Sequence, residues 1–178
     1  MSRYISLVVL VLCVASSYAM KVVDIDTICK HEEVNTSLCI TLLKSKQGAD
    51  LLILAQYTID VLYTEVNNTV TLINTLIHQY YKDLEAKSHY IKCVNLFGEP
   101  NGAAGDIKRI ESTMKDGDYG GMNEKVLSIL IDYDSCINGE YPTDTPYPDK
   151  SLLPKYAKVV HDVAFILFVI SDYLIGNV

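Results

Sequence analysis

Residues 49–82 read ADLLILAQYTIDVLYTEVNNTVTLINTLIHQYYK, and apolar side chains recur along them at the spacing of one helix face. Steps of three or four residues are typical of a helix with one continuous buried stripe. The recurring positions are Leu51, Ala55, Ile59, Leu62, Val66, Val70, Ile73 and Ile77. Such a helix extends on the order of 45 Å. Since only helices of similar length can cover it, the pattern predicts a helical bundle.

The remaining sequence is also patterned mainly for helix. Its expected helical segments are 24–32, 35–43, 84–114, 122–137 and 152–175. The first two are short and separated by a few polar residues, which predicts a helical hairpin. The last contains the apolar run Val163–Ile170 between two aspartates. That run is too short to span a bilayer, so the last helix is expected in the protein core.

Three breaks are expected between or within these helices. Residues 98–102, GEPNG, interrupt the segment 84–114, because proline removes a helix hydrogen bond and glycine resists ordering. Residues 115–121, KDGDYGG, predict a turn. The segment 138–151 contains three prolines, which predicts an extended surface loop.

The first 19 residues are typical of an export signal. Arg3 supplies a positive start, Ile5–Ala15 is nearly all apolar, and Ser17-Tyr18-Ala19 offers small residues at a cleavage site before Met20. The apolar run is shorter than the roughly 20 residues that span a bilayer, so a membrane anchor is not expected. We therefore expect a secreted protein with one mature domain, residues 20–178.

Four cysteines remain after this signal is removed, and they are Cys29, Cys39, Cys93 and Cys136. In an exported chain an even set of cysteines predicts disulfides. Four cysteines allow three pairings. Proximity in the sequence favours Cys29 with Cys39, which leaves Cys93 with Cys136, while the other two pairings need a different topology.

The charge of the chain excludes some partners. The full sequence has 15 Lys and Arg against 22 Asp and Glu, a formal net charge of -7. Loss of Arg3 with the signal leaves 14 against 22, or -8. Nucleic acids and anionic membranes are disfavoured as partners, because binding to them depends on basic patches.

No catalytic, metal or cofactor site is predicted. There is no GxSxG serine motif and no HExxH or CxxC spacing, and the cysteines are expected to be oxidised. The histidines share no ligand spacing, and they are His31, His78, His89 and His161. Asp116, Asp118 and Gly121 match part of a calcium loop, but its twelfth position is Leu127. We therefore do not expect an enzyme.

Paired carboxylates and glycosylation sequons are the remaining polar motifs. Asp132 and Asp134 are expected to lie on a wet helix surface with nothing nearby to perturb them. The sequons Asn35-Thr36-Ser37 and Asn67-Asn68-Thr69 are candidate glycan sites in an exported chain. Asn67 is favoured over Asn35, since Asn35 lies in the tight hairpin.

Several of these features together resemble the plant invertase and pectin methylesterase inhibitor family. They are the signal segment, the pair Cys29-x9-Cys39, the pair Cys93 and Cys136, the turn Gly117-Asp118-Tyr119 and the terminal Val169-Ile170-Ser171-x-x-Leu174. The resemblance implies an all-α fold, in which a helical hairpin (20–48) precedes an up-down-up-down four-helix bundle (49–178). It also implies one disulfide within the hairpin and one between the second and third bundle helices.

The same resemblance implies a function without catalysis. Members form a one-to-one complex that occludes the active-site cleft of a carbohydrate-active enzyme, in the plant cell wall (apoplast) or the vacuole. The Gly117-Asp118-Tyr119 turn and the Val169-Ile170-Ser171 ending favour pectin methylesterase as the target, with an acid invertase as the alternative. The turn is the candidate contact site, on a flank built from the second and third bundle helices.

A ligand carrier is the alternative from another class of protein. Its support is the abundance of tyrosine, 13 in all, because bundle cores can hold ligands. We expect core packing to account for these tyrosines instead.

Overall fold

The structure is a computed structural model that describes residues 22–141, 143 and 145–177. The expected export signal, residues 1–19, lies outside the described residues. Within them every regular element is helical, which confirms the all-α class. The elements are α2 (Ile25–Cys29), α3 (Thr36–Leu43), the 3-10 turn η1 (Lys44–Lys46), α4 (Leu51–Gln79), α5 (Leu84–Phe97), α6 (Ala103–Lys115), α7 (Tyr119–Ile137) and α8 (Leu153–Ile175).

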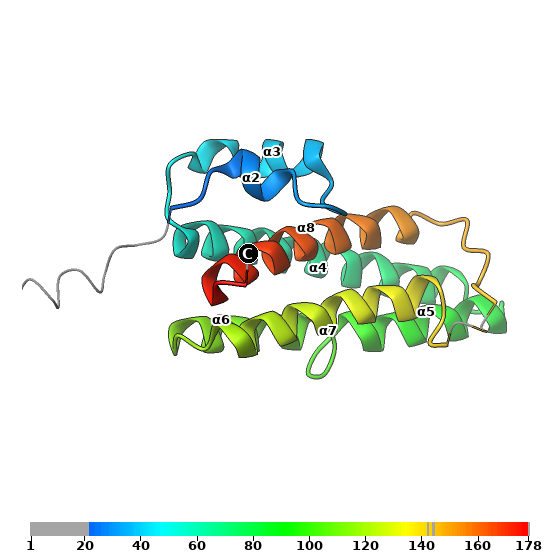
Figure 1. Cartoon of the computed structure of the whole chain (residues 1–178). Helices are drawn as coiled ribbons and strands as arrows, with labels where there is room; N and C mark the ends of the chain where they lie inside the picture. The colour runs from blue at the N-terminus through cyan, green and yellow to red at the C-terminus, as the bar shows by residue number, and fades with distance from the viewer. Residues whose placement is uncertain (1–21, 142, 144, 178) are drawn as a thin grey trace, which may run out of the picture.

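The long helices form an up-down-up-down bundle, as expected. Helix α4 runs one way, α5 and α6 together return as the second bundle helix, and α7 and α8 complete the alternation (Figure 1). In this view α4 and α8 form the upper layer, and α5, α6 and α7 form the lower one. None of the helices in the described part of the chain is long and apolar enough to cross a membrane.

The hairpin of α2 and α3 lies against α8, above the bundle in Figure 1. A disulfide joins Cys29 to Cys39 within the hairpin, with their Cα atoms 5.5 Å apart. The Asn35 side chain donates a hydrogen bond to the buried Asp162 of α8 at 2.9 Å. The hairpin is therefore tied both to itself and to the last helix.

Acidic or amide side chains mark the starts of most helices. At each start a side-chain oxygen accepts a hydrogen bond from a backbone N–H of the first turn, which has no partner within the helix. The capping residues are Asp24, Asn35, Asp50, Asp83 and Asp118. These residues mark where α2, α3, α4, α5 and α7 begin.

The prediction that the third bundle helix begins at Met122 is wrong by one turn, since α7 begins at Tyr119. The Asp118 carboxylate accepts a hydrogen bond from the Gly121 N–H at 2.9 Å. A Cβ at Gly121 would lie 2.3 Å from that carboxylate, so the glycine makes room for the cap. Two of the glycines assigned to the turn therefore belong to the helix.

The buried stripe of α4 is wider than the sequence pattern indicated. Helix α4 packs against α8 and also against α5 and α6, so its buried residues extend beyond a single stripe. Val70 and Ile77, which the pattern placed in the stripe, are only partly buried. The buried residues of α4 are Leu51, Leu54, Ala55, Thr58, Ile59, Leu62, Val66, Thr69, Ile73 and Leu76. Its two buried threonines, Thr58 and Thr69, tolerate burial because each hydroxyl donates to a carbonyl one turn earlier.

Tyrosine contributes less to the core than expected. Tyr90 is the one tyrosine classed as buried among the described residues. Large exposed fractions remain on Tyr63, Tyr81 and Tyr141. Core packing therefore accounts for Tyr90 and for the partly buried tyrosines that pack against the core, which are Tyr57, Tyr80, Tyr133, Tyr147 and Tyr173, but not for the exposed ones.

Candidate functional site

The predicted contact turn, Gly117-Asp118-Tyr119, lies at the end of the bundle between α6 and α7. Gly117 has a φ of 74°, a left-handed conformation that favours glycine. Asp118 caps α7, and Tyr119 is its first residue. Each of these residues thus has a structural task, while Gly117 and Asp118 are also exposed.

The outer face of α7 continues from this turn along the lower layer. Its exposed residues recur at helical spacing, and we name them the α7 stripe: Gly120, Glu124, Leu127, Ile131 and Asp134. Two large apolar side chains, Leu127 (45% exposed) and Ile131 (56% exposed), stand one turn apart in its middle. An apolar centre with charged ends is typical of surfaces that bind another protein.

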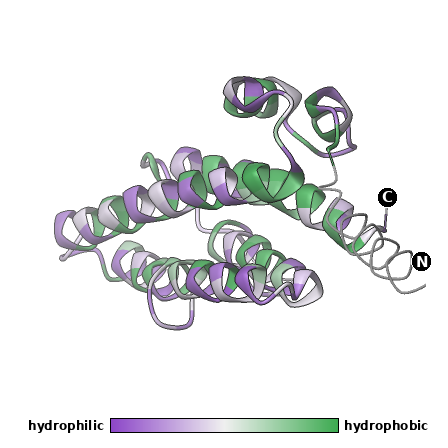
Figure 2. Cartoon of the chain, turned by 90° about the vertical axis from the view of Figure 1, so that its left-hand side faces the viewer, coloured by the Kyte–Doolittle hydropathy of each residue, from purple (hydrophilic) through white to green (hydrophobic). Residues whose placement is uncertain are grey.

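The second bundle helix is interrupted where the sequence predicted a break. Helix α5 ends at Phe97 and α6 begins at Ala103, and the chain between them forms a projecting loop that we name the α5–α6 loop, residues 98–102. The Gly102 N–H closes it by donating to the Gly98 carbonyl at 3.0 Å. Both cartoon views show this loop projecting from the lower layer, away from α4 and α8 (Figures 1 and 2).

Two glycines allow this loop to fold back so tightly. A Cβ at Gly102 would lie 2.2 Å from the Leu96 carbonyl oxygen, and a Cβ at Gly105 would lie 1.9 Å from the Pro100 carbonyl oxygen. Backbone atoms cannot move aside as a flexible side chain can. The loop geometry therefore requires glycine at both positions.

Basic residues on α6 hold the loop in place. The Arg109 guanidinium donates to the Asp106 carboxylate at 2.8 Å and to the Pro100 carbonyl at 3.1 Å. Lys108 pairs with Glu99 at 2.6 Å. Glu99, Pro100 and Asn101 remain exposed at the tip.

A perturbed carboxylate lies on α7 near Asp106 of α6, contrary to the expectation that none occurs. Burial, together with the nearby charge of Asp106, raises the pKa of Asp132 to about 7. Asp134 is exposed, as expected for a surface helix. The sequence could not indicate the pairing, because Asp106 and Asp132 come together only when α6 packs on α7.

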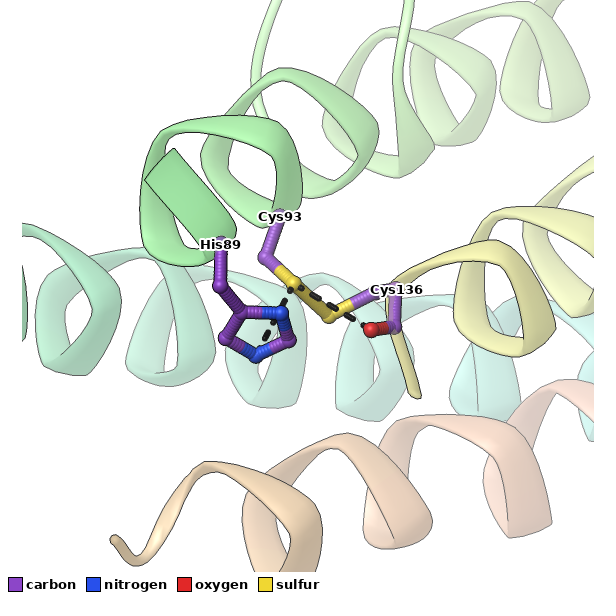
Figure 3. Close-up of side chains that lie close together, drawn as sticks. All are labelled: His89, Cys93 and Cys136. Carbon is purple, nitrogen blue, oxygen red and sulfur yellow. Dashed lines mark hydrogen bonds between the residues drawn. A yellow bond between two sulfur atoms is a disulfide. The ribbon is translucent and has the colours of Figure 1, made fainter. Parts of the chain in front are cut away.

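His89, Cys93 and Cys136 form a close cluster between α5 and α7 (Figure 3). The His89 Nε2 atom lies 3.8 Å from the Cys93 sulfur, and Cys93 is joined to Cys136 by a disulfide with a Cα–Cα distance of 5.0 Å. Cysteine binds a metal ion as the thiolate. The disulfide-bonded cluster is therefore a cross-link of the second and third bundle helices, as the family resemblance implied, and does not offer the thiolates of a metal site.

Residues 145–152, which lead into α8, are anchored to α5 through Asp149 beside this cross-link. Asp149 accepts hydrogen bonds from the Tyr90 hydroxyl at 3.0 Å and from the Ser151 N–H at 2.7 Å. Its other oxygen lies 3.7 Å from His89 Nε2. Burial lowers the pKa of His89, and the Asp149 carboxylate opposes that shift. These contacts keep the proline-rich segment against the bundle.

The two sequons lie in different surroundings. Asn67 is exposed in the middle of α4, whereas Thr69 of the same sequon is buried. Asn35 caps α3 by accepting from the Leu38 N–H and also donates to Asp162. Both the oxygen and the nitrogen of the Asn35 side-chain amide therefore already form hydrogen bonds.

This helical bundle is similar to solved structures of pectin methylesterase inhibitors. The structure has a TM-score of 0.70 to a crystal structure of mutant form A of a pectin methylesterase inhibitor from Arabidopsis, with 26% identity over 83% of this chain and 95% of that one. A second crystal structure of a pectin methylesterase inhibitor from Arabidopsis thaliana has a TM-score of 0.60, with 26% identity over 84% of this chain and 95% of that one.

The sequence itself is 27% identical to pectinesterase inhibitor 1 of Arabidopsis thaliana over 177 residues, or 99% of this chain and 96% of that protein. No protein-family model matches the chain. The resemblance to the plant invertase and pectin methylesterase inhibitor family is therefore confirmed in sequence and in fold. These relatives are inhibitors and not enzymes, in agreement with the expectation for this chain.

Proposed function

We propose that this protein inhibits a pectin methylesterase by docking on the enzyme and covering its active site. Similarity to pectin methylesterase inhibitors in sequence and fold supports an inhibitor role. The observation that carries the proposal is the α7 stripe. It supplies two exposed aliphatic side chains, Leu127 and Ile131, on a rigid helix that is cross-linked to its neighbour.

The docking flank is mixed in charge. Helix α7 contributes the exposed acids Glu124 and Asp134, whereas α6 contributes the exposed bases Lys108, Arg109 and Lys115. Charges of both signs around an apolar centre fix the orientation of a partner more than they add affinity. The turn Gly117-Asp118-Tyr119 continues the flank at one end and is proposed as part of the contact.

The size of the flank suits a one-to-one complex. A stable protein interface buries about 800 Å² on each partner. Helices α6 and α7 run side by side for 13 and 19 residues, which provides a surface of that order. A rigid surface also avoids the entropy cost of ordering loops on binding.

An inhibition assay tests this proposal. The purified protein is titrated against a pectin methylesterase, beside Ile131→Asp and the control Ile53→Asp, whose side chain is 49% exposed at the start of α4. We expect the wild type and Ile53→Asp to inhibit alike, and Ile131→Asp to be at least about tenfold weaker. Full enzyme activity at micromolar wild-type protein would refute inhibition of that enzyme.

An acid invertase is the second candidate target, since the family contains inhibitors of both enzymes. The same titration against an acid invertase separates the two.

A ligand carrier is less well supported. The side chains in the bundle interior are packed to exposures at or near zero, as for Leu62, Phe97 and Ile166. A hollow of about 490 Å³ lies at the surface, open to solvent, and its lining exposes more apolar than polar surface; the lining residues are Glu85, Ser88, His89, Lys92, Thr145, Pro146, Tyr147 and Pro148. An open hollow of this kind buries only part of a small ligand, whereas ligand sites usually enclose most of the ligand surface.

We further propose secretion to the cell wall, with the vacuole as the alternative. The support is the signal-like segment 1–19 and the disulfides, which persist in oxidising compartments. Asn67 is the proposed glycan site. Mass analysis of protein from extracellular fluid tests both points, since it reports the first residue and the glycan.

A further inference from the structure

We propose that the α5–α6 loop, residues 98–102, is a pre-shaped probe that enters the cleft of the partner enzyme and selects which enzyme is bound. This inference rests on the proposed inhibitor function. It assigns the choice of partner to a segment that is neither in the predicted contact turn nor in the α7 stripe.

The position of the loop gives the first argument. It emerges from the second bundle helix next to α7 and projects outward from the lower layer (Figures 1 and 2). A partner that covered the lower layer on this side would meet the loop before it met the helices. The partner surface must therefore be concave opposite residues 98–102, as an enzyme is at its substrate cleft.

The rigidity of the loop gives the second argument. A hydrogen bond from Gly102 to Gly98 closes its base. Arg109 holds the Pro100 carbonyl, and Lys108 holds Glu99. A loop that is already ordered loses little conformational entropy on binding, which is the usual requirement for a loop that inserts into a cleft.

The chemistry of the tip gives the third argument and indicates the kind of cleft. The charges cancel in pairs, Glu99 with Lys108 and Asp106 with Arg109. The exposed uncharged groups at the tip are the apolar ring of Pro100 and the side-chain amide of Asn101. A ring that packs on aromatic side chains and an amide that both donates and accepts hydrogen bonds match a cleft built for sugars, which offers aromatic faces and polar groups.

The test compares one substitution at two sites. Asn101→Arg places a long charged side chain on the tip, whereas Asn74→Arg makes the same change at an exposed position of α4. Each variant is titrated against a pectin methylesterase and an acid invertase beside the wild type. We expect Asn101→Arg to weaken inhibition about tenfold or more and Asn74→Arg to leave it within about twofold.

The outcomes separate this inference from the proposed function. If the wild type inhibits and Asn101→Arg inhibits equally well, the probe is overturned and the inhibitor function stands. If the wild type inhibits neither enzyme, the proposed function fails and the probe fails with it. Thermal unfolding of each variant checks that it is folded. If Asn101→Arg unfolds at a lower temperature than the wild type, Asn101→Ser replaces it. We then expect inhibition to weaken at least about threefold, and unchanged inhibition would count against the probe.

Discussion

Asp132 on α7 lies close enough to the buried Asp106 on α6 for the charge of Asp106 to raise its pKa, in addition to the effect of burial. Arg109 compensates Asp106 directly, through an ion pair of 2.8 Å, and the same guanidinium holds the α5–α6 loop. The α5–α6 loop, Asp106 and Asp132 are therefore linked by electrostatic contacts on the proposed docking flank.

The raised pKa of Asp132 makes the stability of the fold depend on pH. Its pKa is about 7 in the folded protein against 3.8 as the ordinary value. The folded state therefore binds more protons between these values, and the stabilisation present below pH 3.8 is lost as the pH rises through 7. Asp132→Asn cannot ionise, so at pH 8 it should be more stable than the wild type by about 1–2 kcal/mol, allowing for solvent screening.

Urea unfolding of both proteins at pH 4 and pH 8 measures this difference. The advantage of Asp132→Asn should shrink towards pH 4, where the wild-type carboxyl is also neutral. Asp134→Asn is the control, because that carboxylate is exposed on the same helix. A wild type that gains stability relative to Asp132→Asn as the pH rises would contradict the assignment.

Gly102 should be the glycine least tolerant of alanine in the α5–α6 loop. Its Cβ would lie 2.2 Å from the Leu96 carbonyl oxygen, so Gly102→Ala should lower the free energy of unfolding by about 2–4 kcal/mol. Gly120→Ala is the control, since its Cβ would meet only an atom at 3.8 Å inside α7. Alanine there should be neutral or stabilising by up to about 1 kcal/mol. Equal effects of the two changes in chemical denaturation would count against the tight loop.

The two disulfides should contribute unequally to stability. Cys93 and Cys136 are 43 residues apart and Cys29 and Cys39 are 10 apart. In the chain-entropy account the long loop contributes about 4 kcal/mol and the short one about 3 kcal/mol. The double variant Cys93→Ser/Cys136→Ser should therefore melt at a lower temperature than Cys29→Ser/Cys39→Ser. The reverse order would show that the hairpin bridge is the more important cross-link.

Asn35 should be a structural residue and not a glycan site. Its side chain caps α3 and donates to Asp162, so Asn35→Ala should cost about 1–2 kcal/mol of stability. Mass spectrometry of protein from a plant host should find a glycan that disappears in Asn67→Gln. A glycan that persists in Asn67→Gln and is lost in Asn35→Gln would reverse the assignment.

The sequence predicted most of the architecture because apolar spacing and breakers are local signals. The long stripe from Leu51 to Ile77 located α4, and the run GEPNG located the break between α5 and α6. The start of α7 was missed because glycines were taken to end regular structure. In the first turn, a glycine next to the capping Asp118 instead makes room for its carboxylate.

The candidate site was less predictable, because its features depend on tertiary contacts. The sequence does not show that Asp106 approaches Asp132, or that Arg109 reaches back to Pro100 nine residues earlier. The exposure of Leu127 and Ile131 could have been predicted from the sequence, because neither residue lies on the helix face that carries the other apolar residues of α7. Exposed tyrosines were missed because a residue count does not say which face each occupies.

Competition for the enzyme cleft distinguishes an inhibitor that covers the active site from a protein that binds elsewhere on the enzyme. The affinity of this protein for a pectin methylesterase is measured by titration calorimetry, with and without a saturating methylated pectin oligomer. An inhibitor that covers the active site should bind one-to-one, and the oligomer should weaken its apparent affinity at least about tenfold, since both need the same surface. An affinity unchanged by the oligomer, or no binding at micromolar concentrations, would contradict the account.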